Sequence, residues 1–183
     1  MSAEFLLSDR WVSIDVETAG PDPGEFALLA VGACLVRDPD IGCSVELVPD
    51  HDATDASAMA VHGLTMDHLR RNGLPPEAAM TSLEAWLADH VSGAPIMVAF
   101  NAPFDWMFIN HYFWKYLGRN PFGHAAIDIK AFAMGWLGQP WSTTTFPALA
   151  EQMGLALSLS HQALADAQQQ ARLLAAIVNH PRT

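Results

Sequence analysis

The sequence predicts an α/β protein with a central mixed β-sheet flanked by helices, and an α+β arrangement is the alternative. Three strand-like segments come first, and helices then alternate with strands. Apolar residues make up 51% of the 183 residues, which provides a sizeable core and argues against a disordered chain. Neither a repeat nor a linker interrupts the pattern, so we expect one domain over residues 1–183.

The N-terminal segments are predicted to form an antiparallel meander. An apolar run at Trp11 begins the first strand, and residues 26–36 form a second strand that we expect to be central. A turn at Asp38-Pro39-Asp40 leads to a third strand over residues 43–48. Connections this short join antiparallel neighbours.

The rest of the chain is predicted to alternate between helices and strands. The acidic loop over residues 50–55 is expected to be solvated and to supply a helix cap. Residues 95–100 are all apolar, as in a strand buried on both faces. Near-helical spacing of apolar residues and turn residues at the boundaries define the other elements. We expect helices over residues 65–71, 77–91, 104–117, 130–137, 146–153 and 162–178, and a further strand over residues 125–129.

Composition restricts where the protein acts. Residues 1–10 include two acids and no long apolar core, so we expect no signal peptide there, and the longest apolar run is too short to span a bilayer. We therefore expect a soluble cytoplasmic protein without a membrane partner. Cys34 and Cys43 face each other across the predicted hairpin, where a disulfide is conceivable, but a cytosolic setting favours two buried thiols.

The charge balance bears on possible nucleic-acid partners. The net charge is −11 with only nine lysines and arginines, which argues against a protein that grips duplex nucleic acid with a basic face. The same charge is compatible with an enzyme that meets phosphates through metal ions.

Two acids lie inside the first strand. Because strand side chains alternate between faces, Asp15 and Glu17 are predicted to point the same way. Two carboxylates on a mostly buried face repel each other and lose hydration, which costs several kcal/mol unless a cation or a donor compensates. Oxygen ligands of this kind suit Mg²⁺ or Mn²⁺. The alternative is that the strand ends at Asp15 and both acids are solvated.

Two further acids occur at places where open sheets bind ligands. Asp105 follows a buried strand and falls in the first turn of the next helix, a position that the helix dipole alone would also explain. Asp166 lies among apolar residues of the last helix and needs a partner. His161 is five residues earlier and would be about 140° away on a straight helix. We therefore expect His161 on the preceding loop or first turn, leaning over the site to which Asp166 points.

Together these residues resemble the motifs of the DnaQ-like 3′–5′ exonucleases of the DEDDh type. The three motifs are Asp15-Val16-Glu17-Thr18, Asn101-Ala102-Pro103-Phe104-Asp105 and His161-Gln162-Ala163-Leu164-Ala165-Asp166-Ala167. Three motifs in this order, with the histidine at its proper offset, are specific, and the likeness spans roughly residues 11–178. Residues 60–65 also resemble the segment that approaches the terminal nucleotide in these enzymes.

Within that family the chain has features similar to ribonuclease T. These features lie at residues 15–20, 27–29, 96–99 and 119–122. The chain departs from the pattern at three positions: Phe100 stands where many relatives have histidine, Ala30 where they have an acid, and Pro21 where ribonuclease T-like members carry a stacking aromatic residue. The resemblance also raises the possibility of a homodimer.

The resemblance implies a ribonuclease H-like fold and a single 3′–5′ exonuclease domain over residues 1–183. It implies hydrolysis at the 3′ end of single-stranded DNA or RNA, with release of nucleoside monophosphates and two Mg²⁺ or Mn²⁺ ions per site. The alternative is a non-catalytic nucleic-acid-binding or protein-interaction module, such as a proofreading-type subunit.

The residue roles follow the same resemblance. Asp15 would bridge the two metals, Glu17 and Asp166 would complete one coordination sphere, and Asp105 would act on the second metal. His161 would be the general base. The expected substrate-binding residues are Thr18, Ala19, His62 and Asn101.

Overall fold

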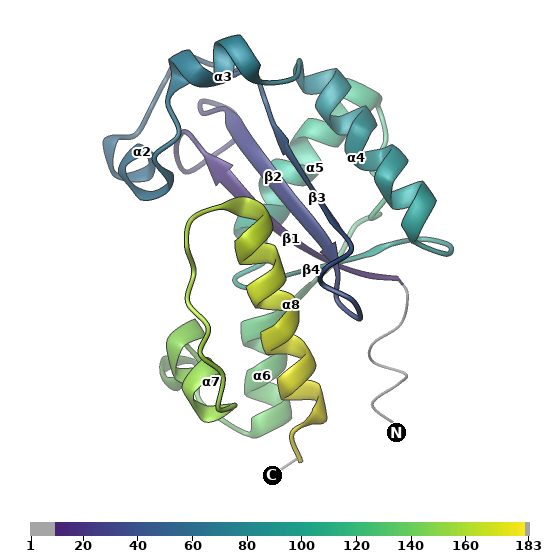
Figure 1. Ribbon diagram of the computed structural model, residues 1–183, viewed down its shortest axis with the longest axis vertical. Coiled ribbons are helices and arrows are strands. Elements are labelled where there is room, and N and C mark those ends of the chain that lie inside the picture. Colours follow the sequence, from purple (N-terminus) through teal and green to yellow (C-terminus); the bar gives the residue numbers. More distant parts are fainter. Residues whose placement is uncertain (1–9, 182–183) are drawn as a thin grey trace.

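The computed structural model describes residues 10–181, which form a five-stranded mixed sheet of order β3-β2-β1-β4-β5 (Figure 1). Residues 1–9, over which the sequence predicts no signal peptide, and residues 182–183 lie outside this range. The strands are β1 (Trp11–Thr18), β2 (Leu28–Leu35), β3 (Gly42–Glu46), β4 (Ile96–Ala99) and β5 (Ala126–Asp128). The predicted mixed sheet and antiparallel meander are confirmed.

β1 is the middle strand of this sheet. It pairs antiparallel with β2 on one edge and parallel with β4 on the other. The expectation that residues 26–36 form a central strand is confirmed, because β2 pairs with β1 on one side and with β3 on the other, and β4 and β5 extend the sheet beyond β1. Within β1, only Trp11–Ser13 pair with β4, so the second half of β1 extends past this parallel neighbour. That half contains both predicted acids.

The predicted helices form with small shifts at their ends. Two elements were not predicted, namely α2 and the 3₁₀ helix η1. Asp55 caps α2 by accepting hydrogen bonds from the N–H groups of Ser57 and Ala58, as the acidic loop had indicated. No helix within residues 10–181 is long and apolar enough to cross a bilayer. The helices are α2 (Ala56–His62), α3 (Met66–Asn72), α4 (Pro76–His90), α5 (Pro103–Leu117), α6 (Ile129–Leu137), η1 (Trp141–Thr143), α7 (Phe146–Gln152) and α8 (Ala163–Asn179).

The sheet separates two apolar cores. Val12, Ile14 and Val16 of β1 point into the core formed with α4 and α5. The opposite face, to which Trp11 points, packs against α6, α7 and α8. α8 lies along α6 in front of the strands (Figure 1). Because side chains alternate, Asp15 and Glu17 face the α8 side of the sheet.

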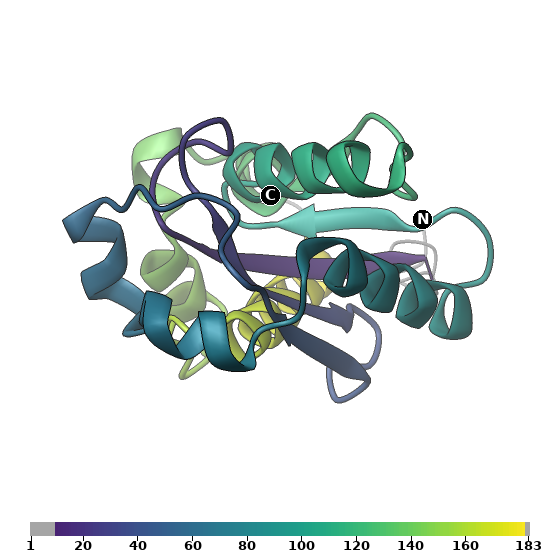
Figure 2. The ribbon, with the colours of Figure 1, turned by 90° about the horizontal axis from the view of Figure 1, so that it is seen from above.

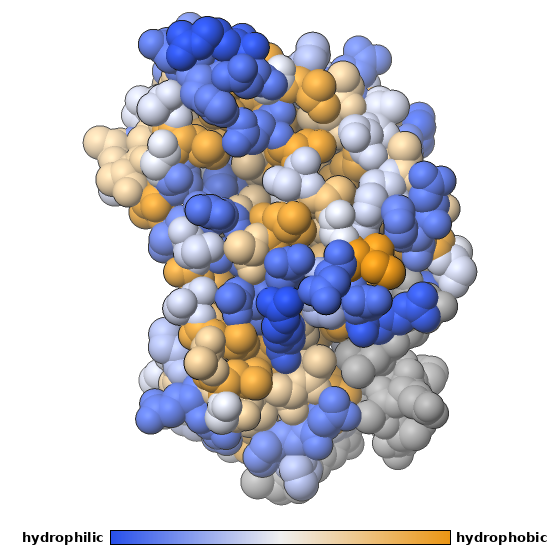
Figure 3. Space-filling model, viewed as in Figure 1, coloured by the Kyte–Doolittle hydropathy of each residue, from blue (hydrophilic) through white to orange (hydrophobic). Residues whose placement is uncertain are grey.

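α2 and α3 lie together at the end of the sheet toward which β1 runs (Figure 2). A third small core, which includes Ala19, Leu29 and Leu69, joins them to the strands. Hydrophilic side chains gather over α3 at the top of the molecule (Figure 3). Thus α2 and α3 cover the carboxyl end of β1.

Both cysteines carry free thiols. Cys34 is buried and Cys43 is half-buried. The strand register pairs Cys43 with Ala33, one residue away from Cys34. Burial raises the pKa of the Cys34 thiol to about 12, which keeps it protonated. The prediction of two thiols in place of a disulfide is confirmed, but only one of the two, Cys34, is fully buried as expected.

Gly32 of β2 allows α8 to approach the sheet. It pairs directly with Asp15 on the neighbouring strand. A Cβ atom at this position would lie 2.1 Å from the backbone carbon of Ala163 and 2.2 Å from the backbone nitrogen of Leu164. The first turn of α8 therefore packs against bare backbone, which brings the helix next to β1.

We predict that Gly32→Ala destabilises the protein by about 1–3 kcal/mol, the usual cost of overpacking a core. The added methyl group must displace the backbone of α8, which cannot rotate away as a side chain would. Gly135→Ala is the matched control, because this helical glycine has open space around it. The control should be neutral or more stable by about 0.5–1 kcal/mol. Urea unfolding measures both, and equal effects would contradict this account of Gly32.

Candidate active site

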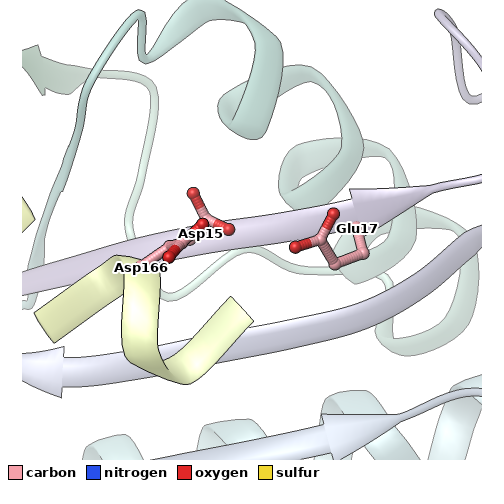
Figure 4. A group of neighbouring side chains, drawn as sticks. All are labelled: Asp15, Glu17 and Asp166. Carbon is pink, nitrogen blue, oxygen red and sulfur yellow. The ribbon is translucent and has the colours of Figure 1, made fainter. Parts of the chain in front are cut away.

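Three carboxylates gather between β1 and α8. One oxygen each from Asp15, Glu17 and Asp166 lies within 4.8 Å of the other two (Figure 4). β1 runs through Thr18, so the alternative that the strand ends at Asp15 is wrong. Strand alternation places Asp15 and Glu17 on one face, and the close approach of α8 adds Asp166 from a part of the chain about 150 residues away.

Asp105 approaches the same strand from α5. It is buried in the first turn of that helix, and its Oδ1 accepts a hydrogen bond of 3.1 Å from the Val16 N–H. Val16 separates Asp15 from Glu17, in the half of β1 that extends past β4. Asp105 is not one of the three acids within 4.8 Å, but its charge acts on Asp15. The structure therefore brings all four predicted acids to one end of β1.

Asp166 is tied to the loop that precedes α8. Its carboxylate accepts hydrogen bonds from Ser160 N at 2.7 Å, from Ser160 Oγ at 2.9 Å and from His161 N at 2.8 Å. His161 is exposed and has a φ angle of 57°, which non-glycine residues rarely adopt. It lies on the loop before α8, as the sequence had predicted. The three bonds hold His161 close to Asp166 in spite of the strained backbone.

Burial and like charges raise the pKa values of Asp15, Glu17 and Asp105. Burial places the pKa of Asp15 well above its ordinary value, and the charges of Asp105 and Glu17 add to the effect. Burial, reinforced by the Asp166 carboxylate, raises the pKa of Glu17 to about 7. Burial also raises the pKa of Asp105. The site therefore favours extra positive charge, supplied either by protons or by a cation.

The donor set fits hard divalent cations. All the clustered side chains offer carboxylate oxygens, which are the ligands that Mg²⁺ and Mn²⁺ prefer. Asp15 Oδ1 and Asp166 Oδ2 each accept one hydrogen bond and keep a further lone pair for a metal, whereas Asp166 Oδ1 already accepts two. A divalent cation among Asp15, Glu17 and Asp166 would offset the repulsion that helps to raise the pKa values of Asp15 and Glu17.

The expected substrate-binding residues have different surroundings. His62 ends α2, and its Nε2 lies 3.2 Å from the Thr18 carbonyl oxygen. With Glu17 and His161 it lines a cleft of about 480 Å³. Burial lowers the pKa of His62, and the positive charge of a protonated His161 would lower it further.

The other expected residues differ in their accessibility to a ligand. Thr18 lines a neighbouring cleft of about 390 Å³ with Val61 and Phe104, both partly exposed. Ala19 is fully buried, and its N–H donates to the Ala27 carbonyl oxygen at 2.8 Å. Asn101 is exposed, with a φ angle of 59° in the turn before α5. The structure thus brings His62 and Thr18 to the clefts and keeps the side chain of Ala19 in the core.

Sequence reasoning missed two polar residues beside the acids. Gln170 of α8 is buried, and its Nε2 donates to Asp15 Oδ1 at 2.7 Å. Asp128 accepts a hydrogen bond of 2.7 Å from the Ala102 N–H and caps α6. A signal existed for Gln170, because it follows Asp166 by four residues and therefore shares its helix face. Asp128 gave no comparable signal beyond its place before a helix.

Comparison with known proteins gives a consistent result. The family model described as "Exonuclease" matches residues 12–174. The 3′–5′ DNA exonuclease Cap18 of Escherichia coli is 41% identical over 165 residues, which cover 89% of this chain and 88% of that protein. The fold is that of the ribonuclease H-like DEDDh exonucleases. The chain belongs to the exonuclease family, which confirms the resemblance seen in its motifs.

Solved structures with little sequence identity share the fold. A 3′-exonuclease that recognises the histone mRNA stem-loop aligns with a TM-score of 0.74 at 15% identity, over 92% of this chain and 63% of that one. The nuclease domain of the DEDDh family member 3′hExo, bound to rAMP, aligns with a TM-score of 0.71 at 14% identity, over 90% of this chain and 88% of that one. E. coli exonuclease I in complex with a dT13 oligonucleotide aligns with a TM-score of 0.69 at 15% identity, over 90% of this chain and 40% of that one. The chain thus spans less than two thirds of the first and the third of these proteins.

We predict that the metal-free protein loses stability as pH rises. Folding raises the pKa of Glu17 from its ordinary 4.5 to about 7, so between these values the folded state binds more protons than the unfolded state. The stability that protonated Glu17 contributes is fully present below pH 4.5 and is lost as pH rises through about 7. Urea unfolding in EDTA at several pH values across this range measures it. Glu17→Gln should flatten the pH dependence, and an unchanged slope in that variant would count against the assignment.

Proposed function

We propose that this protein is a metal-dependent 3′–5′ exonuclease that hydrolyses phosphodiester bonds at the 3′ end of single-stranded nucleic acid and releases nucleoside monophosphates. The observation that carries the proposal is the cluster of Asp15, Glu17 and Asp166 at a cleft lined by His161. The name of the E. coli relative supports the 3′–5′ direction and favours DNA over RNA as the substrate. Family membership supports the hydrolase class.

Two divalent cations, Mg²⁺ or Mn²⁺, are proposed to bind at the acids. When bound, such a pair activates water and stabilises the leaving 3′ oxygen. Asp15 would bridge the ions, Glu17 and Asp166 would complete one coordination sphere, and Asp105 would serve the other directly or through water. The position of Asp105 outside the three acids that lie within 4.8 Å of one another supports the indirect alternative.

His161 is proposed as the general base. It is exposed at the mouth of the cleft that Glu17 also lines, so its ring is accessible to an attacking water. The hydrogen bond from its backbone N–H to Asp166 holds the loop beside the acids. A base so held takes the proton from the water as the phosphodiester bond is attacked.

The terminal nucleotide is proposed to bind between β1 and α2. His62 faces the same cleft as Glu17, and Thr18 lines the neighbouring apolar cleft with Phe104. Asn101, exposed at the turn before α5, would contact the substrate from the other side. Ala19 would act through its position in the backbone, because its side chain is buried.

A preference for single strands follows from the proposed site. A paired end must first be opened, and unpairing costs about a few kcal/mol. The net charge of −11 adds repulsion toward a duplex, whose phosphates are dense. A single strand whose terminal phosphate meets the metals avoids much of this cost.

The homodimer and the cytoplasmic location stay predictions, and sedimentation at micromolar concentration tests the homodimer.

We predict that a labelled single strand is shortened from its 3′ end with Mg²⁺ or Mn²⁺ and stays intact in excess EDTA. Matched DNA and RNA strands, together with a blunt duplex, establish the substrate class. Asp15→Asn should lower the rate by orders of magnitude while the protein stays folded, because an amide bridges two cations poorly. Binding without cleavage by the wild-type protein would favour the alternative of a non-catalytic binding module.

We predict that His161→Ala lowers kcat by about 10²- to 10⁴-fold, the usual scale for the loss of a general base. Single-turnover rates at saturating Mg²⁺ provide the measurement. The control is His124→Ala, which removes a histidine from the loop before β5 and should leave kcat unchanged. Wild-type turnover by the His161 variant would exclude the proposed role.

A further inference from the structure

Gln170 connects Asp15 to the end of β4. It lies on α8 with 2% of its surface exposed. Its Nε2 donates to Asp15 Oδ1 at 2.7 Å, and its Oε1 accepts a hydrogen bond of 2.7 Å from the Phe100 N–H. One buried carboxamide therefore joins residues that lie 155 and 70 positions away in the chain.

The two partners fix the orientation of the amide. The Phe100 N–H is a donor, so it requires the oxygen of Gln170, and the nitrogen must then face Asp15. A rotation of the amide by 180° would place its NH₂ group against the Phe100 N–H, and its oxygen against the carboxylate oxygen of Asp15. Because the amide is buried, an orientation that leaves its nitrogen or its oxygen without a hydrogen bond is disfavoured.

The helix that carries Gln170 also carries Asp166. The two residues are four positions apart, which is one turn on the same helix face. α8 therefore contributes one acid directly and holds a second acid through an amide. The position of Asp15 relative to Asp166 is set by one rigid element, whose packing on β2 depends on Gly32.

The bond leaves Asp15 free to bind cations. Oδ1 accepts one hydrogen bond from Nε2 and keeps another lone pair, while Oδ2 retains both of its own. The carboxylate is thus held in one rotation without losing its capacity as a ligand. Partners of this kind around a metal site orient the ligands, and their loss commonly lowers metal affinity by about 10- to 100-fold.

We propose that Gln170 is a positioning residue that orients Asp15 for binding of a divalent cation. The role rests on the proposed function, in that it requires the acids to bind metal. Gln170 does not touch the substrate or the reacting atoms. The competing interpretation is that the amide only fastens α8 to the end of β4, so that its loss affects stability alone.

The test compares Gln170→Met with the wild-type protein in direct Mn²⁺ titrations without nucleic acid. Methionine fills a similar volume but offers neither the donor nor the oxygen acceptor. We expect the Gln170→Met variant to bind Mn²⁺ at least about 10-fold more weakly than the wild-type protein. Electron paramagnetic resonance, which detects the free ion, measures this affinity. Raising the Mn²⁺ concentration should then restore most of the lost kcat.

A matched control separates positioning from stability. Ile177→Ala truncates a fully buried residue near the other end of α8 and destabilises the same helix. It should lower the melting temperature and leave Mn²⁺ affinity unchanged. Should Gln170→Met fail to fold, Gln170→Asn replaces it, because an amide one methylene shorter reaches only one of the two partners.

The outcomes are distinguishable. Wild-type Mn²⁺ affinity in the folded Gln170 variant would overturn the positioning role alone, and so would an equal loss of affinity in the Ile177 control. A wild-type protein that binds no Mn²⁺ would overturn the proposed function and this role together. Weakened binding confined to the Gln170 variants supports the role.

Discussion

Repulsion among closely spaced, largely buried carboxylates is the constraint on which the rest of this structure depends. Asp15, Glu17 and Asp166 place oxygens within 4.8 Å of one another, and burial raises the pKa of two of these acids. Without a counter-charge such a cluster opposes folding. The packing that forces it together is apolar and extensive, with α8 seated on β2 through a glycine that leaves no room for a side chain.

Fixed N–H donors hold several of the acids in place. Asp105 accepts from the backbone of β1, Asp166 from the loop before α8, and Asp15 from the amide of Gln170. These donors favour the charged carboxylates and restrict their rotation without adding a net positive charge. Held in this way, acids from three elements stay ready for cations and keep free lone pairs. The left-handed backbone of His161 shows that part of this arrangement is strained.

The distribution of basic residues agrees with a site that meets phosphates through cations. Several arginines form ion pairs with surface acids, among them Arg70 with Asp52 and Arg172 with Asp40. Such exposed pairs contribute little to stability, but they reduce the positive charge available to a nucleic-acid backbone. Under the proposed function, affinity for phosphate is therefore concentrated where the acids bind metal.

The sequence by itself determined the local features of this protein. Alternation in β1 placed Asp15 and Glu17 on one face, and the five-residue offset placed His161 on a loop, because both depend on the geometry of neighbouring residues. The tertiary structure decided the rest. It made β1 the middle strand and selected Gln170 as the partner of Asp15. These outcomes depend on packing between segments up to 155 residues apart. Helix spacing indicates that Gln170 shares a face with Asp166, but no local pattern pairs it with Asp15.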